Sequence, residues 1–256
     1  MISKEELELK RIFKEFDCPL TSTDYATDIP GIVRKAAVLL LLRWCDTECC
    51  WKILLTIRSQ IVSTHQGEVA FPGGMRDKED HSPVETALRE AYEEVGVPYS
   101  YVHVIGTAPP FRTRFNFALY PVIGVLDSNV TYQPFPNEEV SACFWVRLDR
   151  FLSTSGYSVR QFTVKDVSFS TNVFEDVVEC CDEPVITWGI TAFIAIVAAM
   201  ITYQRKPEYA FPAMWTLRGS KFHASTDLDW SQVVHAILDH AISVIPPAPP
   251  VRPAKL

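Results

Sequence analysis

The stretch 73-GGMRDKEDHSPVETALREAYEEVGV-97 contains the most clearly specified helix of this 256-residue chain. Ser82 is a preferred N-cap residue, Pro83 suits the first helical position, and Glu85 completes a capping box. Gly96 is a typical C-terminal stop. Apolar residues recur between these ends at three- and four-residue spacing, which predicts one buried face. These residues are Val84, Ala87, Leu88, Ala91 and Val95.

Three carboxylates lie beside that apolar face. Glu90, Glu93 and Glu94 fall within an arc of roughly 100° on an ideal helix, where they repel each other. The ordinary explanation is a solvated acidic face, but no lysine is interleaved at four-residue spacing to relieve the repulsion. Three further acidic residues, Asp77, Glu79 and Asp80, come just before the helix. Oxygen ligands at this density favour a site for a hard divalent cation such as Mg²⁺ or Mn²⁺.

Residues 89–97, REAYEEVGV, resemble the core of the Nudix box, the motif of hydrolases that cleave diphosphate bonds. Residues 54–74, LLTIRSQIVSTHQGEVAFPGG, resemble the upstream signature of the coenzyme A diphosphatases, whose box carries the same one-residue insertion. The chain departs from the family pattern at Ser63, where members usually have a basic residue. His81 stands where the general motif has a glutamate.

The resemblance implies an α/β fold, the Nudix-type α/β/α sandwich around a mixed β-sheet. It implies metal-dependent hydrolysis of coenzyme A and acyl-coenzyme A to 3′,5′-ADP and (acyl-)4′-phosphopantetheine. Alternatives are a Nudix hydrolase of another dinucleotide, such as NADH or a dinucleoside polyphosphate, and a non-catalytic nucleotide-binding Nudix module. The intact Arg-Glu-x-x-Glu-Glu pattern argues against the non-catalytic module, which has no need for mutually repelling carboxylates.

Site residues follow from the same resemblance. Glu90, Glu93 and Glu94 are the expected metal ligands, with the backbone carbonyl near Gly74 completing the set. Arg89 is expected to pair with one of the carboxylates and fix its orientation.

Two further roles are predicted. Glu93 is the expected general base, and Glu138 and Glu139 are alternatives from a loop outside the box. Coenzyme A also needs a cation for its 3′-phosphate, although an exposed arginine is as often merely solvated. The candidates for this contact are Arg58, Arg112 and Arg114.

The composition is that of a globular protein, with 48% apolar and 21% charged residues. The net charge of −7 and the scattered basic residues argue against nucleic-acid binding. The seven cysteines form neither an even disulfide set nor a zinc pattern, which favours reduced thiols in an intracellular compartment. Apolar runs at 36–42 and 53–57 predict buried strands, and periodicity over 229–245 predicts a helix. The uncharged run 184–204 predicts a buried helix rather than a membrane span.

The expected organisation has three parts. Residues 1–30 form an N-terminal helix and lead-in, and residues 31–245 form a single Nudix hydrolase domain with C-terminal helices. Residues 246–256 form a proline-rich tail that ends in Ala254, Lys255 and Leu256. This ending resembles the peroxisomal targeting signal, which predicts a location in the peroxisomal matrix and binding to the peroxisomal import receptor.

Overall fold

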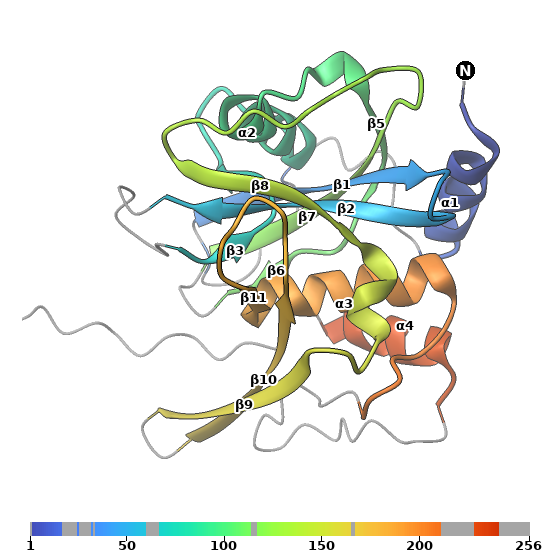
Figure 1. Ribbon diagram of the computed structural model, residues 1–256, viewed down its shortest axis with the longest axis vertical. Helices are drawn as coiled ribbons and strands as arrows, with labels where there is room; N and C mark the ends of the chain where they lie inside the picture. Colours follow the sequence, from blue (N-terminus) through green and yellow to red (C-terminus); the bar gives the residue numbers. More distant parts are fainter. Residues whose placement is uncertain are drawn as a thin grey trace, which may run out of the picture.

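The computed structural model describes residues 2–16, 25, 32, 34–59, 67–113, 117–164, 167–210 and 228–240. The first predicted buried strand belongs to β1 (Arg34–Cys45), the central strand of an eight-stranded sheet (Figure 1). Leu40 and Leu42 pack into the core on one face of the sheet, and Leu39 and Leu41 pack into the core on the other. Both faces of β1 are covered, which explains why residues 36–42 are apolar at every position.

The sheet is mixed. Its main path runs β3-β2-β1-β7-β5, while β4 pairs with β1, β6 with β7 and β8 with β2. β1 and β7 are parallel, and the other pairs are antiparallel. The bounds are β2 (Cys50–Arg58), β3 (Val69–Ala70), β4 (Gly73–Met75), β5 (Val102–Thr107), β6 (Phe111–Arg112), β7 (Phe117–Leu126) and β8 (Val140–Arg147).

Helices cover both faces of this sheet (Figure 1). The helix α2 (Pro83–Val95) packs on one face through Ala87, Ala91 and Val95. The apolar sides of three helices pack on the other face, namely α1 (Lys4–Glu15), α3 (Gly189–Tyr203) and α4 (Trp230–His240). The short 3₁₀ helices are η1 (Tyr99–Tyr101) and η2 (Leu148–Leu152). The predicted α/β/α sandwich around a mixed sheet is confirmed.

The apolar run 184–204 forms two elements rather than one. Its first part is the strand β11 (Val185–Trp188), and the chain turns into α3 at Gly189, whose φ of 66° suits glycine. The side chains of α3 from Thr191 to Thr202 are buried, so a buried helix is confirmed for this part of the run. Among the described residues, no helix combines the length and the apolar character needed to cross a bilayer.

A second sheet was not predicted from the sequence. It is antiparallel and contains β9 (Tyr157–Val164), β10 (Val167–Asp176) and β11 in the order β11-β10-β9. The β9–β10 hairpin extends away from the sandwich (Figure 1). Several residues singled out in the sequence lie outside the described part of the chain: Ser63, Arg114, Ala254, Lys255 and Leu256.

Candidate active site

The helix α2 begins and ends where the sequence predicts. The hydroxyl of Ser82 accepts a hydrogen bond from the backbone N–H of Glu85 at 3.2 Å, and Pro83 occupies the first turn. Gly96 ends the helix with a left-handed φ of 71°. One detail of the capping box differs, because the Glu85 carboxylate accepts from the N–H of His81 at 2.7 Å rather than from that of Ser82.

The three carboxylates of α2 have different environments. The side chain of Glu94 is 4% exposed, that of Glu90 is 16% exposed, and that of Glu93 is 52% exposed. Glu94 is therefore buried and Glu90 partly buried between the helix and β4, whereas Glu93 is exposed to solvent.

The glycine pair before the helix packs directly against these buried carboxylates. The N–H of Gly73 donates to Oε2 of Glu94 at 2.9 Å. A Cβ atom added to Gly74 would lie 2.4 Å from Oε1 of Glu90, so only glycine leaves room for that carboxylate. Pairing of β4 with β1 brings the two glycines to this position, with Gly74 opposite Ala37.

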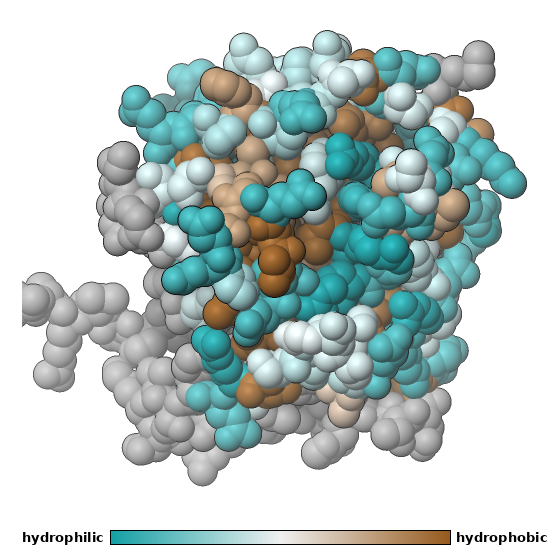
Figure 2. All heavy atoms as spheres, in the orientation of Figure 1, coloured by the Kyte–Doolittle hydropathy of each residue, from teal (hydrophilic) through white to brown (hydrophobic). Residues whose placement is uncertain are grey.

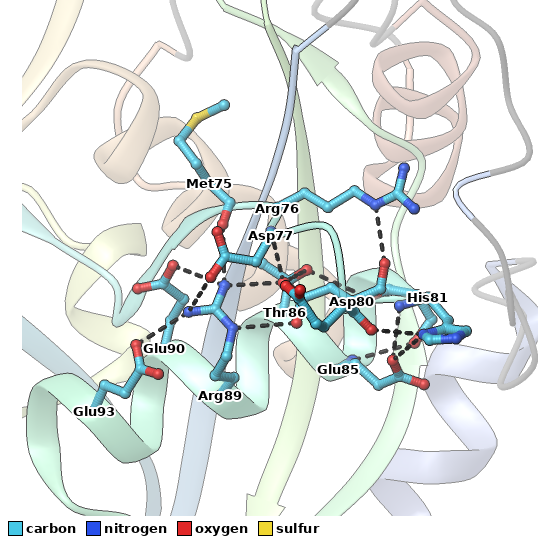
Figure 3. A network of polar contacts seen from close by, with 12 residues as sticks. Met75, Arg76, Asp77, Asp80, His81, Glu85, Thr86, Arg89, Glu90 and Glu93 are labelled. Carbon is cyan, nitrogen blue, oxygen red and sulfur yellow. Dashed lines mark hydrogen bonds and ion pairs between the residues drawn. The ribbon is translucent and has the colours of Figure 1, made fainter.

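Arg89 is the centre of a network that joins the helix to the loop before it (Figure 3). Its Nε and Nη2 donate to the two carboxylate oxygens of Asp80 at 3.1 and 2.9 Å. Its Nη2 also donates to the carbonyl of Met75 at 3.1 Å and lies 3.1 Å from Oε1 of Glu90. Its Nη1 donates to Oε2 of Glu93 at 3.0 Å. Arg89 thus holds three carboxylates and the end of β4 in one arrangement.

The sequence grouped Asp80 with the possible oxygen ligands, but in the structure this residue is the principal partner of Arg89. Burial alone would raise the pKa of Asp80. Hydrogen bonds from Arg89, from the N–H of Asp77 and from the hydroxyl of Thr86 instead lower the pKa to about 2. The same bond to Asp80 raises the pKa of Arg89, so this pair stays ionised.

Glu90 and Glu94 show the opposite effect. Burial raises the pKa of Glu94 to about 7, with the N–H of Gly73 opposing the shift and the charges of Glu90 and Glu139 adding to it. Burial also raises the pKa of Glu90, against the effect of Arg89. The negative charge of these two side chains is therefore only partly compensated by the protein.

A loop from the other end of the sheet completes the site. The N–H of Asn137 donates to the carbonyl of Glu94 at 3.0 Å, and the carbonyl of Glu139 accepts from the N–H of Ser59 at 2.8 Å. These two bonds hold Glu139 near the buried carboxylates, whose pKa values its charge raises. Sequence reasoning named Glu139 only as an alternative base, because its approach to the helix depends on tertiary structure.

The two arginines predicted to bind substrate lie on different strands. Arg58 ends β2, and its Nη1 lies 3.6 Å from Oε1 of Glu94. Arg112 lies in β6 and is paired with Ala118 of β7. Lys35 of β1 is aligned with the same alanine, so Arg112 and Lys35 lie at the same end of the sheet. Arg58 thus forms an ion pair with Glu94. Arg112 of β6 is separated from β1 by the strand β7.

The chemistry of these groups fits a hard divalent cation. The carboxylates of the buried Glu94 and the partly buried Glu90 have raised pKa values, and such a cation would neutralise their charge. The backbone carbonyl of the adjoining Gly74 is a further oxygen donor. In the described part of the chain, however, no three Asp, Glu, His or Cys side chains already converge as a ligand set. Glu93 is held by Arg89, so it would have to turn inward to join Glu90 and Glu94.

Comparison with known proteins identifies the fold around this site. Residues 33–164, just over half of the chain, match the family described as the NUDIX domain. This chain belongs to the Nudix hydrolase family. The matched segment ends with β9, so β10, β11, α3 and α4 lie beyond it.

Individual relatives extend the similarity further. The chain is 36% identical over 204 residues to the peroxisomal coenzyme A diphosphatase ndx-8 of Caenorhabditis elegans, a match covering 79% of this chain and 80% of that protein. It is 35% identical over 177 residues to the mitochondrial Nudix hydrolase 15 of Arabidopsis thaliana, covering 69% and 61%. It is 34% identical over 196 residues to the chloroplastic Nudix hydrolase 22 of the same plant, covering 76% and 64%. The matches thus span less than two thirds of the length of the two plant proteins.

Proposed function

We propose that this protein hydrolyses the diphosphate bond of coenzyme A and acyl-coenzyme A, giving 3′,5′-ADP and (acyl-)4′-phosphopantetheine. The observation that carries the proposal is the meeting of the two family motifs in space. Arg58 and the glycine pair, from the signature at 54–74, contact Glu94 and Glu90 of the Nudix-box helix. The similarity to the nematode coenzyme A diphosphatase supports the same substrate class.

Nudix hydrolases generally need a divalent cation, and we propose Mg²⁺ or Mn²⁺ here, held by Glu90 and Glu94 with Glu93 and the carbonyl of Gly74. When bound, such an ion supplies charge neutralisation for the diphosphate and lowers the pKa of water. Arg89 is a positioning residue, because its bonds to Asp80 and Met75 fix the carboxylates of the helix relative to β4.

The remaining groups of the site have roles that follow from their positions. The guanidinium of Arg58, 3.6 Å from Glu94, is suited to contact phosphate oxygens and to stabilise charge that develops on the leaving group. Two carboxylates are candidates for the general base that takes the proton of the attacking water. Glu93 is bonded to Arg89 at the solvent edge, and Glu139 approaches from the loop after β7.

A substrate panel tests the proposed reaction. Coenzyme A, acyl-coenzyme A esters, NADH and a dinucleoside polyphosphate would be incubated with the full chain and Mg²⁺ or Mn²⁺, and the products identified by mass spectrometry. We expect 3′,5′-ADP and 4′-phosphopantetheine from coenzyme A, with the highest kcat/KM for coenzyme A or one of its esters. A higher kcat/KM for NADH or the polyphosphate would contradict the proposal.

Matched variants attribute the activity to this site. Glu90→Gln removes a partly buried carboxylate beside Gly74, whereas Glu175→Gln makes the same chemical change on an exposed side chain of β10. We expect the first variant to lose orders of magnitude in kcat and the second to match the wild type. Equal activity of all three proteins would show that the hydrolysis comes from a contaminant or from another site.

We also propose a peroxisomal location, as in the name of the nematode relative, although the two plant relatives are named for mitochondria and chloroplasts. The full chain, tagged at its N-terminus, should colocalise with a peroxisomal marker. A chain that lacks Ala254, Lys255 and Leu256 should become cytosolic, because the import receptor would no longer find its targeting signal. Colocalisation with a mitochondrial marker would contradict the proposal.

A further inference from the structure

Two cations other than Arg58 and Arg89 lie against the same aromatic ring. Lys35 lies near the start of β1, and Arg76 directly follows β4. The N–H of Arg76 donates to the carbonyl of Lys35 at 2.9 Å, so the two residues are neighbours on paired chains. The Nζ of Lys35 lies 5.5 Å from the centroid of the Tyr25 ring, and Cζ of Arg76 lies 4.7 Å from the same centroid. Both contacts are in the range of cation–π interactions.

Each of these cations donates a hydrogen bond to a backbone carbonyl. Lys35 donates to the carbonyl of Tyr25, and Nε of Arg76 donates to the carbonyl of Asp80 at 3.0 Å. Within the described residues Arg76 has no ion pair, and the carboxylate of the nearby Asp80 is bonded to Arg89 instead. Arg76 is exposed, so its guanidinium retains donors for an anion from solution.

Arg112 extends this basic region across the sheet. It lies opposite Ala118 of β7, and Ala118 lies opposite Lys35 of β1. Residues in one such row point to the same face, and Ala118 packs on the face that α2 covers. The backbones of Lys35 and Arg112 are two strand spacings apart, roughly 10 Å. Long side chains from both positions can therefore converge on one anionic group. We call Lys35, Arg76 and Arg112 the basic patch.

The basic patch is fixed relative to the catalytic helix. The hydroxyl of Tyr25 contacts Oγ1 of Thr86 at 2.5 Å, and Thr86 donates to Oδ2 of Asp80 at 2.8 Å. Asp80 in turn holds Arg89. Arg76 follows Gly74 by two residues, a span of roughly 7 Å in extended chain. Figure 3 shows the Arg76 side chain extending away from Arg89 and Glu90, so this arginine lies beside the carboxylates of α2 and does not point at them.

We propose that the basic patch binds a phosphomonoester on the nucleoside half of the substrate. A phosphomonoester carries nearly two negative charges and three acceptor oxygens, which suit a bidentate arginine and a nearby ammonium group. Resting on the proposed function, this group is the 3′-phosphate of coenzyme A. In this arrangement Arg58 contacts the reacting diphosphate, and the basic patch contacts the 3′-phosphate.

Steady-state kinetics with a pair of substrates tests the assignment. Coenzyme A and 3′-dephospho-coenzyme A differ only in the phosphomonoester. For Arg76→Ala we expect KM for coenzyme A to rise about tenfold or more, since this is the usual size of a charge-assisted contact. KM for the dephospho substrate and kcat for both should stay near the wild-type values. Equal losses on the two substrates, or no loss on either, would overturn the assignment.

Further variants guard against a general effect on folding or charge. Arg76→Lys should recover part of the affinity for coenzyme A, and Lys35→Gln should repeat the selective loss. Arg160→Ala removes an exposed arginine from β9, in the other sheet, and should change neither KM. If Arg160→Ala weakens coenzyme A as much as Arg76→Ala does, the effect is one of net charge alone and the assignment fails.

Calorimetry separates this inference from the proposed reaction. Metal-free protein would be titrated with 3′,5′-ADP and with AMP, which lacks the 3′-phosphate. We expect 3′,5′-ADP to bind more tightly, and Arg76→Ala to remove most of the difference. If the protein cleaves neither coenzyme A nor its dephospho form but keeps this Arg76-dependent difference, the proposed function fails and the basic patch stands. If it cleaves coenzyme A and shows no such difference, the basic patch fails alone.

Discussion

The α-carbon of Gly74 lies against the carboxylate of Glu90, so closely that an added Cβ atom would be 2.4 Å from Oε1. The neighbouring Gly73 is also crowded, but by backbone: its Cβ atom would lie 2.4 Å from the carbonyl oxygen of Ala37. Gly73 has in addition a φ of +153°, which side chains rarely adopt. Two adjacent glycines therefore serve different purposes: Gly74 leaves room for the Glu90 carboxylate, and Gly73 allows β4 to pair with β1.

Gly74→Ala should separate activity from stability. The methyl group meets the end of a side chain, which can move, so the fold should survive with a change of less than about 1 kcal/mol in the free energy of unfolding. The displaced Glu90 carboxylate should lower kcat by about 100-fold, the size expected for a displacement of about 1 Å. Urea unfolding and steady-state kinetics measure the two effects.

Gly73→Ala is the matched control. Its methyl group meets backbone and its φ is unfavourable, so we expect a loss of about 1–3 kcal/mol or more in the free energy of unfolding. If Gly74→Ala is the less stable of the two variants, or if it keeps full activity, the interpretation of the glycine pair is wrong.

Glu94→Gln should abolish most turnover while stabilising the metal-free protein at alkaline pH. Glu94 is 4% exposed, and burial raises its pKa to about 7. A carboxylate whose folded-state pKa is raised destabilises the fold once it ionises, so wild-type stability should fall as the pH rises from about 5 to 8. The amide stays neutral and its oxygen can still accept from Gly73.

The comparison is made by urea unfolding in the presence of a chelator. At pH 5 the variant and the wild type should have similar free energies of unfolding. At pH 8 the variant should be more stable by an amount on the order of 3 kcal/mol. Near-normal kcat with saturating Mg²⁺ would contradict the metal-ligand role. A variant less stable than the wild type at pH 8 would contradict the burial of an uncompensated charge.

The helix α2 was predictable because the interactions that begin and end it are between residues close in sequence. The N-cap Ser82, Pro83 and the left-handed Gly96 each act within one turn of the chain, and all three are found as predicted. The strands within β1 and β2 were predictable for a similar reason, since a fully covered strand needs an uninterrupted apolar run. The second sheet was missed because β9 and β10 have no such run: polar and apolar residues are mixed along both strands, although Val173 and Phe174 of β10 are buried.

The partners that the site residues find outside the helix could not be predicted, because they depend on how loops fold against it. Spacing places Arg89 near Glu90 and Glu93, but its two-pronged contact with Asp80 depends on how the loop at 76–82 folds back. The approach of Glu139 to the helix depends on tertiary bonds at Asn137 and Ser59. The break in the apolar run at Gly189 is visible in the sequence as a single glycine, which is weak evidence by itself.

Asp80→Asn should destabilise the protein in a pH-dependent way. The pKa of Asp80 is lowered to about 2, so the ionised group contributes stability that is present above its unfolded pKa near 4 and is lost as the pH falls through 2. At pH 7 we expect the variant to lose about 2 kcal/mol in the free energy of unfolding. The difference from the wild type should shrink between pH 4 and pH 2, as measured by urea unfolding in chelator.

Asp77→Asn is the control for this experiment. Its side chain is 66% exposed and its carboxylate lies 3.9 Å from Nη1 of Arg89, so the change should stay within about 0.5 kcal/mol at every pH. Equal effects of the two substitutions would mean that net charge, rather than the contact of Asp80 with Arg89, sets the stability.

The general base can be identified by comparing Glu139→Gln with Glu93→Gln. A general base must be ionised to work, so its loss should remove the acidic limb of the kcat–pH profile as well as lower kcat by about 100-fold or more. The carboxylate of Glu93 is bonded to Nη1 of Arg89, so it must leave this contact before it can approach an attacking water. Glu139 lies near enough to Glu90 and Glu94 for its charge to act on them, and its backbone is held by Ser59. We therefore expect the acidic limb to disappear in Glu139→Gln and to persist in Glu93→Gln at a lower kcat.

Glu138→Gln, one residue earlier in the same loop, is the matched control and should keep both the acidic limb and most of the rate. If the limb disappears in Glu93→Gln and persists in Glu139→Gln, the base is the one predicted from the sequence, and Arg89 must release Glu93 when substrate binds.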